Sequence, residues 1–397
     1  MRVLIVASLF APWRLGGAEV AAESTARAFA DLGHEVHVLT LSPDQGTSQD
    51  HHDGYEIRRI PLVNIYPLQD MGRATTLQRV RWHIKDHWNS AMQIAFTFEL
   101  KKIQPDVVLL HNITGFSISI YESLADASVP FFQVLHDHYF ICLYSTMYRR
   151  KKICDGQCLR CSLLRRRHLK TTQFATGVIG VSNFILNRIK SMGYFSGVPS
   201  NVIHNLSDKP PKINLTEDIS GVAPKLGCTL GYLGILTESK GILDLLRAFK
   251  ISAGPSDRLI LAGHLDNRLS HLQTTFNTDS RIEYLGVVER DFFFSSIDCL
   301  VIPSKVPEAF GLVAQEALFR GIPVLVSNQG GLPEVVAASP SAHVYNARDP
   351  DGLTVALQTL LSDHDQWQRS QVISDIYYSA LQQDWEKSYE GFLKMYA

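Results

Sequence analysis

Two consecutive series of short apolar runs, each alternating with helix-like segments, restrict the fold of this chain more than any other feature. The first series opens with "RVLIVA" (2–7), a helical pattern that stops at Gly33, and "EVHVLTL" (35–41). A strand, a helix and a strand at this spacing predict a parallel sheet covered by helices. One or two amphipathic helices are predicted over 73–102. The first series continues in four more runs, at 106–111, 130–136, 176–182 and 201–205.

A proline-rich polar segment without periodicity, residues 206–226, separates the two series and predicts a linker. The second series comprises six runs, at 228–234, 258–263, 281–286, 298–303, 323–327 and 342–345. Because 397 residues exceed what one hydrophobic core usually organises, we expect two doubly wound α/β domains. Ligands of such sheets lie beyond the carboxyl ends of the strands, so the site is expected in a cleft between two facing domains.

The composition is that of a soluble globular protein, with 45% hydrophobic and 19% charged residues. No apolar run approaches the roughly 20 residues that span a bilayer, and the first run is interpreted as a strand, so a cytoplasmic protein is predicted. Residues 1–200 hold 22 Lys and Arg against 16 Asp and Glu, whereas the remainder holds 16 against 23. A basic first half favours an anionic membrane or a phosphorylated acceptor as partner. Nucleic acid is not expected, since no aromatic platform is interleaved with the basic residues.

The stretch "PEAFGLVAQEALFRGIPV" (307–324) carries two carboxylates eight positions apart. Glu308 follows a predicted strand, the next helix is predicted from about Gly311 to Arg320, and Glu316 belongs to its second turn. Three backbone N–H groups at the helix start can bind hydroxyl or phosphate oxygens, those of Phe310, Gly311 and Leu312. Such carboxylates suit sugar hydroxyls, and a polyhydroxylated anion is the natural ligand. From the spacing alone, a capped surface helix with two solvated acids is an equally good interpretation.

A second segment, "GYLGILTESKGILDLLRAF" (231–249), predicts a strand, a glycine turn and a helix. It places the cation of Lys240 at another helix start in the same half of the chain. A diphosphate would require such a cation.

These two segments, together with "LILAGHL", "IEYLGVV" and "GIPVLVSNQGGLPEVV", closely resemble the donor half of the family 4 glycosyltransferases. The first half is similar too, with "GGAEV" (16–20) after the first strand, and "DWEKSYEGFLKMY" (384–396) resembles the family's last helix, which crosses back to the first domain. The resemblance implies the GT-B architecture of two Rossmann-like domains. Residues 1–206 with a helix at about 380–397 would bind the acceptor, and residues 207–379 would bind the donor.

The activity implied is transfer of a sugar from a UDP- or GDP-type nucleotide sugar to a saccharide or lipid-linked acceptor, with retention of configuration, in surface polysaccharide or glycolipid synthesis. His136, Glu308 and Lys240 would be the catalytic residues, with His136 near the anomeric centre. For His136 taken alone, a strand-end histidine bonded to backbone is the competing interpretation. The donor-binding residues implied are Gly16, Gly17, Gly234, Lys240, Glu308, Ala309, Phe310, Gly311, Leu312 and Glu316. The chain departs from the family at Ile235, where the family usually has arginine, a bidentate phosphate ligand that lysine does not replace.

No catalytic metal and no organic cofactor are implied. No separate base is apparent either, which suits a same-face substitution in which the leaving phosphate accepts the acceptor's proton. Asp363-His364-Asp365 resembles a metal-binding DxD only superficially, since it lies in a predicted helical region. Four of the six cysteines crowd into one predicted loop, namely Cys142, Cys154, Cys158 and Cys161. A structural zinc site is one interpretation of this spacing, and disulfides or free thiols are the other. An iron–sulfur site of the radical-enzyme type is a weak match.

The same loop carries the basic runs "RRKK" (149–152) and "RRRHLK" (165–170). Such runs are usually solvated faces, but here they could dock the protein peripherally on the inner face of the plasma membrane, where a lipid-diphosphate acceptor would lie.

Four other functions compete with the transferase. A GT-B phosphorylase would use a pyridoxal lysine, for which the sequence offers no clear candidate, and a sugar-nucleotide epimerase would not need a basic acceptor face. A non-catalytic sugar-nucleotide-binding subunit is kept open by Ile235. A nicotinamide dehydrogenase is disfavoured, because "SLFAPWRLGGAE" after the first strand is not GxGxxG.

Overall fold

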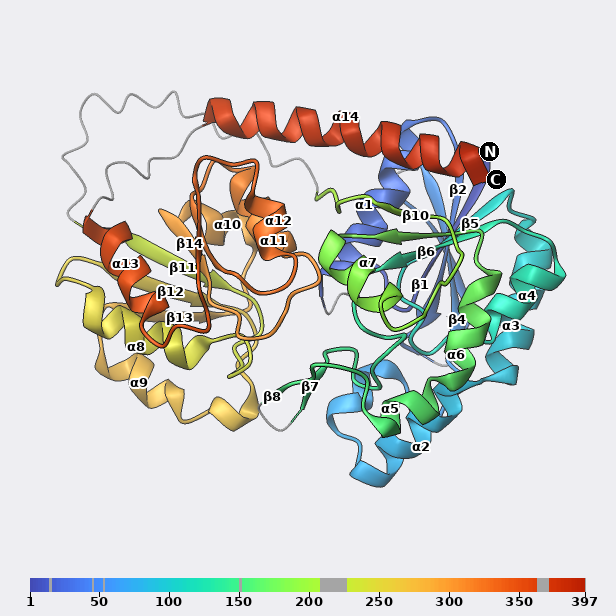
Figure 1. Ribbon diagram of the computed structural model, residues 1–397, viewed down its shortest axis with the longest axis horizontal. Helices are drawn as coiled ribbons and strands as arrows, with labels where there is room; N and C mark the ends of the chain where they lie inside the picture. Colours follow the sequence, from blue (N-terminus) through green and yellow to red (C-terminus); the bar gives the residue numbers. More distant parts are fainter. Residues whose placement is uncertain are drawn as a thin grey trace. The chain divides into compact units, whose positions relative to one another are not determined.

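A computed structural model describes residues 1–13, 16–44, 46–52, 54–149, 152–207, 227–362 and 371–396 (Figure 1). The chain divides into two compact units, which are residues 1–206 with 384–397, and residues 207–383. We call these the first unit and the second unit. Each contains a predominantly parallel sheet with helices, which confirms the predicted α/β class. The division between 206 and 207 coincides with the expected one, and the acceptor and donor roles of the two units stay predictions.

The first unit is built on an eight-stranded sheet of order β10-β9-β6-β5-β1-β2-β4-β3. Its strands are β1 (Arg2–Ala7), β2 (Glu35–Ser42), β3 (Ser48–His52), β4 (Tyr55–Pro61), β5 (Val107–Leu110), β6 (Phe131–Leu135), β9 (Gly177–Gly180) and β10 (Ser200–Val202). All neighbours are parallel except β3, which pairs antiparallel with β4. The sequence analysis missed this hairpin, because "SQDHH" has no apolar residue and all five residues are exposed. Strand β3 therefore forms through pairing along the sheet edge rather than through burial.

Helices of the first unit fill the crossovers between its parallel strands, and one further hairpin lies in the cysteine-containing loop. They are α1 (Gly17–Asp31), α2 (Thr76–His87), α3 (Ser90–Ile103), α4 (Ile120–Asp126), α5 (Leu159–Leu164), α6 (Arg166–Thr171) and α7 (Asn183–Lys190), with the hairpin strands β7 (Tyr148–Arg149) and β8 (Lys152–Ile153). Helix α1 is buried at Ala22, Ala26 and Phe29. The region predicted as one or two helices over 73–102 forms two, α2 and α3.

The last helix, α14 (Gln371–Tyr396), ends against the first unit, as the resemblance implied for the C-terminal segment. The rings of Trp385 and Tyr389 each lie 5.9 Å from the ring of Phe29, and that of Phe392 lies 5.3 Å from Phe132. Aromatic contacts of this kind add to the free energy gained by burial alone. A segment nearly 360 residues from Phe29 in sequence therefore belongs to the same core.

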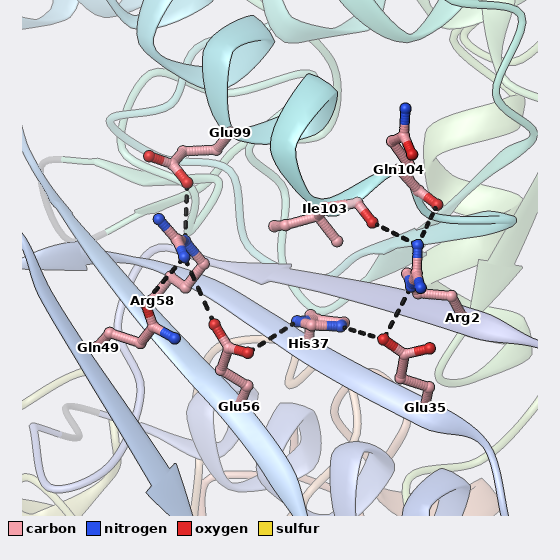
Figure 2. Close-up of polar contacts among 9 residues, drawn as sticks. All are labelled: Arg2, Glu35, His37, Gln49, Glu56, Arg58, Glu99, Ile103 and Gln104. Carbon is pink, nitrogen blue, oxygen red and sulfur yellow. Dashed lines mark hydrogen bonds and ion pairs between the residues drawn. The ribbon is translucent and has the colours of Figure 1, made fainter.

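Polar contacts also fasten α3 to the sheet, as Figure 2 shows. The Arg58 Nε donates to Glu99 Oε2 at 2.7 Å, and Glu99 is almost fully buried. Arg2 donates to Glu35 Oε1 at 2.8 Å and to the Ile103 carbonyl at 3.0 Å. Because Arg2 and Glu35 begin β1 and β2, their end of the network lies opposite the carboxyl ends of the strands, so we assign it to structure and not to ligand binding.

The second unit is built on a six-stranded parallel sheet of order β13-β12-β11-β14-β15-β16. Its strands are β11 (Thr229–Leu233), β12 (Arg258–Ala262), β13 (Ile282–Gly286), β14 (Cys299–Ile302), β15 (Val324–Ser327) and β16 (Ala342–Tyr345). Its helices are α8 (Ile242–Ser252), α9 (Leu272–Thr278), α10 (Arg290–Ser295), α11 (Leu312–Leu318), α12 (Leu332–Val336) and α13 (Gly352–Ser362). The helix predicted from Gly311 to Arg320 is shorter than expected, because Gly311 caps its start and the chain turns at Phe319.

In both sheets the strand order reverses beside the first strand of the series. Strand β1 lies between β2 and β5, and β11 lies between β12 and β14. Loops that leave neighbouring strands in opposite directions open a crevice at the carboxyl edge, where ligands of doubly wound sheets bind. Each unit therefore has one position at which a ligand site is expected.

Gly241 shows how tightly the loops at this edge of the second unit are packed. It lies at φ +78°, and a Cβ there would stand 1.8 Å from the Pro303 carbonyl oxygen. We predict that Gly241→Ala lowers the free energy of unfolding by more than about 2 kcal/mol, measured by denaturant titration. Gly391→Ala is the control, because Gly391 lies within α14 and nothing stands within 4 Å of its Cβ position. The control should be neutral or gain up to about 1 kcal/mol, and equal effects of the two substitutions would contradict this packing.

Candidate active site

Lys240 and Glu308 meet at the point where the strand order of the second sheet reverses. Lys240 lies between β11 and α8, and Glu308 lies between β14 and α11. The Lys240 Nζ is 2.6 Å from Glu308 Oε1 and 2.8 Å from Oε2. The two side chains are 37% and 19% exposed, so a solute can reach the pair. The structure thus brings together two of the residues that the sequence analysis placed at the donor diphosphate and the donor sugar.

The backbone of Glu308 is held by the loop after β15. The Glu308 carbonyl accepts a hydrogen bond of 2.7 Å from the Gly331 N–H, and Glu308 forms a parallel bridge with Gly330. A Cβ at Gly330 would stand 2.1 Å from the Glu308 carbonyl oxygen, so only glycine allows this approach. Close by in sequence, Phe310 is buried. The Glu308 carboxylate therefore projects from a fixed backbone.

Glu316 lies within α11 and is 4% exposed. Its Oε1 forms an ion pair with the guanidinium of Arg290, which opens α10. The Glu316 carbonyl also accepts a hydrogen bond of 3.0 Å from Arg320. The sequence analysis missed Arg290, because nothing in the spacing relates the residue after β13 to a helix 26 positions further on. The half-exposed Arg290 adds a cation to a carboxylate that the resemblance places among the donor-binding residues.

Gly234 directly follows β11 and carries the departure from the family pattern. Its N–H donates to the Ala262 carbonyl at 3.0 Å. The carbonyl of Ile235 accepts a hydrogen bond of 2.9 Å from the Tyr232 hydroxyl, and its side chain is 49% exposed. The position where arginine is usual in the family therefore presents an apolar side chain to solvent.

Gly16 and Gly17 lie at the start of α1, after β1 in the first unit. The sequence analysis placed both among the donor-binding residues. The Gly16 N–H instead donates to the Glu19 carboxylate at 2.8 Å, in the reciprocal arrangement of a capping box. A phosphate could take this N–H only by displacing Glu19.

His136 directly follows β6 and pairs with a histidine that the sequence analysis did not single out. Its Nε2 is 2.9 Å from the Nδ1 of His111, which directly follows β5, and the two rings stack with centroids 5.0 Å apart. Both rings line a cavity of about 10 Å³, enough for one water molecule, together with Asp137 and Tyr139. The signal was in the sequence, since "DVVLLH" and "PFFQVLH" each end a strand in histidine and these strands are neighbours.

Burial sets the protonation of these groups. It lowers the pKa of His136 to about 3 and that of His111 well below its ordinary value, so both imidazoles are neutral near pH 7. Burial also raises the pKa of Asp137 to about 6, and the negative charge of Glu19 adds to this effect. The helix start after β1 and the end of β6 are thus close enough to interact at the carboxyl edge of the first sheet.

The four cysteines of the loop carry no disulfide. Contact with the Cys161 thiol lowers the pKa of Cys142 to about 6, and the same contact raises the pKa of Cys161. Across the described ranges, no three His, Cys, Asp or Glu side chains are arranged to hold a metal ion. The zinc site stays a prediction. Asp363-His364-Asp365 and the middle of "RRKK" fall outside the described residues.

None of the helices in the described part of the chain is both long and apolar enough to cross a membrane.

Two family models match the chain in sequence. Glycosyltransferase Family 4 matches residues 15–208, and Glycosyl transferases group 1 matches residues 223–374. Together they account for most of the chain, which therefore belongs to the family 4 glycosyltransferases. The predicted family is confirmed.

Individual proteins agree with this assignment. An uncharacterized 42.6 kDa protein in the cps region of Klebsiella pneumoniae is 26% identical over 343 residues, which cover 86% of this chain and 89% of that protein. Among solved structures, sucrose-phosphate synthase from Thermosynechococcus elongatus has a TM-score of 0.73 at 17% identity over 99% of both chains. HepE from Anabaena in complex with UDP-glucose has a TM-score of 0.66 at 18% identity, over 98% of this chain and 100% of that one. These likenesses confirm the GT-B fold.

The lowered histidine pKa values predict loss of stability in acid. A histidine with a folded pKa near 3 and an unfolded pKa near 6.5 binds more protons when unfolded, so the free energy of unfolding falls as pH decreases between these values. Seven histidines of the first unit share this direction, namely His34, His83, His87, His111, His136, His138 and His168. The raised pKa values of Asp86 and Asp137 have the opposite effect on the free energy of unfolding, over a narrower range of pH.

We therefore expect the urea concentration at the unfolding midpoint to decrease as the pH is lowered from about 7.5 to about 5. Tryptophan fluorescence would follow the unfolding. His136→Gln removes one of the titrating groups and should make this fall shallower. A variant with the same pH dependence as the wild type would show that His136 is not held neutral by the fold.

Proposed function

We propose that the protein is a retaining transferase that moves a sugar from a nucleoside-diphosphate sugar, of the UDP or GDP type, to a saccharide or lipid-linked acceptor. The observation that carries this proposal is the Lys240–Glu308 pair at the reversal point of the second sheet, 2.6 Å apart and open to solutes. Family membership supports the transfer of a glycosyl group, and the pair supplies the charges that such a donor requires.

The proposed roles follow from charge. As the glycosidic bond breaks, negative charge accumulates on the departing diphosphate, and a fixed cation stabilises it most in the transition state. The Lys240 ammonium would exchange its contact with Glu308 for phosphate oxygens when the donor binds. The Glu308 carboxylate would then accept hydrogen bonds from sugar hydroxyls. Its backbone stays in place because the Gly331 N–H donates to the Glu308 carbonyl.

Glu316 would bind the ribose hydroxyls of the donor by the same kind of exchange. Its Oε1 is engaged by Arg290, whose half-exposed guanidinium is within reach of an arriving ligand. A diphosphate or a sugar hydroxyl could share this ion pair without leaving either charge buried and unpaired. Arg290 is therefore proposed as a donor-binding residue that the motif alone does not reveal.

His136 is proposed to act as a neutral hydrogen-bonding group near the anomeric carbon and not as a general base. A base with a pKa of about 3 would hold a transferred proton poorly near pH 7. The proton of the acceptor hydroxyl would pass instead to the departing phosphate on the same face of the sugar, which is consistent with retention of configuration. The proposed reaction requires no catalytic metal and no organic cofactor.

Surface polysaccharide or glycolipid synthesis is the proposed setting. The Klebsiella pneumoniae relative is described by its position in a cps region, and an O-antigen chain mannosyltransferase of Escherichia coli is 31% identical over 145 residues. HepE was solved with UDP-glucose, which supports a nucleotide sugar as donor. A lipid-linked acceptor would bring the protein to the inner face of the plasma membrane.

A non-catalytic sugar-nucleotide-binding subunit is the second candidate, and Ile235 is the observation in its favour. Its exposed apolar side chain stands where family members usually offer an arginine to phosphate. A protein without that arginine could bind a donor and turn it over slowly or not at all. Turnover by the purified protein separates the two candidates.

We predict that the purified protein releases nucleoside diphosphate from at least one member of a panel of UDP-, GDP-, ADP- and TDP-sugars. Lys240→Ala and Glu308→Gln should each lower kcat/KM for that donor by about 100-fold to 1,000-fold, the usual effect of removing one transition-state contact. Lys305→Ala is the matched control, because Lys305 forms an ion pair of 2.9 Å with Asp244 in the same unit and has no proposed role. The control should remain within about threefold of the wild type.

Binding of a donor without release would favour the non-catalytic subunit. An equal loss in all three variants would contradict a specific role for the Lys240–Glu308 pair. Once an acceptor is found, proton NMR of the product decides retention, since an inverted anomeric configuration would overturn that part of the proposal.

A further inference from the structure

Asp86 lies near the end of α2 and contacts two loops of the first unit at once. It is 1% exposed. Its Oδ1 accepts a hydrogen bond of 2.7 Å from the Gly115 N–H, and its Oδ2 accepts one of 3.0 Å from the Tyr139 hydroxyl. Burial raises the pKa of Asp86 to about 6, against the lowering effect of the Arg165 charge and of these two hydrogen bonds. The carboxylate is therefore mainly ionised at pH 7, where both of its oxygens only accept hydrogen bonds.

The two loops that Asp86 contacts are the loops that carry the paired histidines. Gly115 lies four positions after His111 in the loop that leaves β5, and Tyr139 lies three positions after His136 in the loop that leaves β6. Tyr139 also lines the cavity of about 10 Å³ that both imidazoles line. The two loops therefore meet twice, at the contact of 2.9 Å between the rings and through the Asp86 carboxylate.

The short stretches between these contacts and the histidines are held by further hydrogen bonds. The side-chain amide of Gln133 donates to the His111 carbonyl at 2.8 Å. The Tyr139 N–H donates to Asp137 Oδ1 at 2.7 Å, directly beside His136 in sequence. Because so few residues lie between, a displacement of either loop would move a histidine ring and would not be absorbed along the chain.

A buried cation, Arg165, lies against the same tyrosine. Arg165 is 1% exposed, and its guanidinium lies 4.3 Å from the centre of the Tyr139 ring. The guanidinium is also 3.0 Å from the His168 Nε2. Buried charges of this kind stabilise a fold no more than well-packed apolar side chains would. A satisfied buried network does fix one arrangement, because each displaced group would lose its partner in a medium of low dielectric. Precise placement of the loops therefore explains the network better than stability does.

We propose that Asp86 is a positioning residue, which holds the loops after β5 and β6 so that His111 keeps the His136 ring in its place. The inference rests on the proposed function, because that function puts His136 beside the anomeric carbon. The contact between His136 Nε2 and His111 Nδ1 needs a proton on one of the two nitrogens and a lone pair on the other. It thus determines which nitrogen of each neutral ring is protonated, and a misplaced loop would release this control.

The first test needs no donor. In the full-length protein labelled with nitrogen-15 histidine, long-range nitrogen–proton spectra report the tautomer and hydrogen bonding of each ring, and His111→Gln and His136→Gln assign the two sets of signals. Asp86→Ala and Tyr139→Phe should each shift the His136 signals in the same direction. The protein with both substitutions should shift them no further, since both changes break the same link. Tyr139→Phe keeps the ring beside Arg165, so the test remains decisive if Asp86→Ala fails to fold.

Glu99→Ala is the matched control for Asp86→Ala. Glu99 is also a buried carboxylate of the first unit, but its partner at 2.7 Å is Arg58 on β4. The control should lower the urea midpoint, because it leaves a buried guanidinium without its partner. It should leave the signals of His111 and His136 where they are in the wild type.

The second test is steady-state kinetics with the accepted nucleotide sugar. Because a misplaced group loses contact in the transition state above all, Asp86→Ala and Tyr139→Phe should lower kcat by about tenfold to 100-fold and leave KM within about threefold. Asp86→Asn should recover most of this loss, since its amide oxygen can accept from the Gly115 N–H and its amide nitrogen can donate to the Tyr139 oxygen. Glu99→Ala should keep kcat within about threefold of the wild type, whereas a purely structural role for Asp86 would make activity follow stability in every variant.

Unchanged His136 signals in Asp86→Ala and Tyr139→Phe would overturn the proposal, whether or not the protein turns over a donor. Shifted signals with an unchanged kcat would overturn the part of Asp86 in the reaction. A wild type that releases no nucleoside diphosphate would contradict the proposed function, and the histidine signals would still decide whether Asp86 holds the pair.

Discussion

Parallel pairing of the strands is the constraint on which the arrangement of both units depends. Each parallel neighbour has to be reached by a crossover, so the loops that leave the carboxyl ends gather at one edge of the sheet. Where the order reverses beside β11, this brings Lys240 and Glu308 together across 68 residues of sequence. The approach of the loops is close enough that Gly241 and Gly330 meet neighbouring carbonyl oxygens where other residues would have a Cβ. Backbone packing therefore fixes the position of the charges.

The two units use opposite electrostatics at these edges. In the second unit, cation–carboxylate pairs stand where a ligand can reach them, and a nucleotide sugar offers both kinds of partner, phosphates for Lys240 and hydroxyls for Glu308 and Glu316. In the first unit, burial keeps His111 and His136 neutral in mutual contact. Exchangeable charges suit the recognition of an ionic donor. Neutral hydrogen-bonding groups suit a position beside a reacting carbon, because an added fixed charge there would oppose proton transfer to the departing phosphate.

The sequence predicted the structure best where burial of apolar runs and the parallel direction of the strands together determine the position of a residue. Apolar runs predicted the buried strands, and residues placed after strands β11 and β14 were correctly expected at one edge. Strand β3 was missed because its pairing does not depend on apolar side chains. Arg290 was missed because a partner from a distant segment leaves no local spacing. His111 could have been found, since it and His136 follow two neighbouring strands. The engagement of the Gly16 N–H by Glu19 could have been predicted, since a carboxylate three residues after a helix cap is a familiar capping signal. Four nearby cysteines left a structural zinc site, disulfides and free thiols open, because spacing in a loop does not determine how sulfur atoms are arranged, and the zinc site stays a prediction.

The claim that Lys240 and Glu308 act on the donor as one unit is the centre of this account, and a double-mutant cycle tests it most directly. The measurement is kcat/KM for the accepted nucleotide sugar in the wild type, Lys240→Ala, Glu308→Ala and the protein with both substitutions. Residues that act as a unit are strongly non-additive, so the double variant should lose no more than about tenfold beyond the more damaged single variant. If the two single losses instead multiply in the double variant, the residues act independently and the pair is not the element that organises the site.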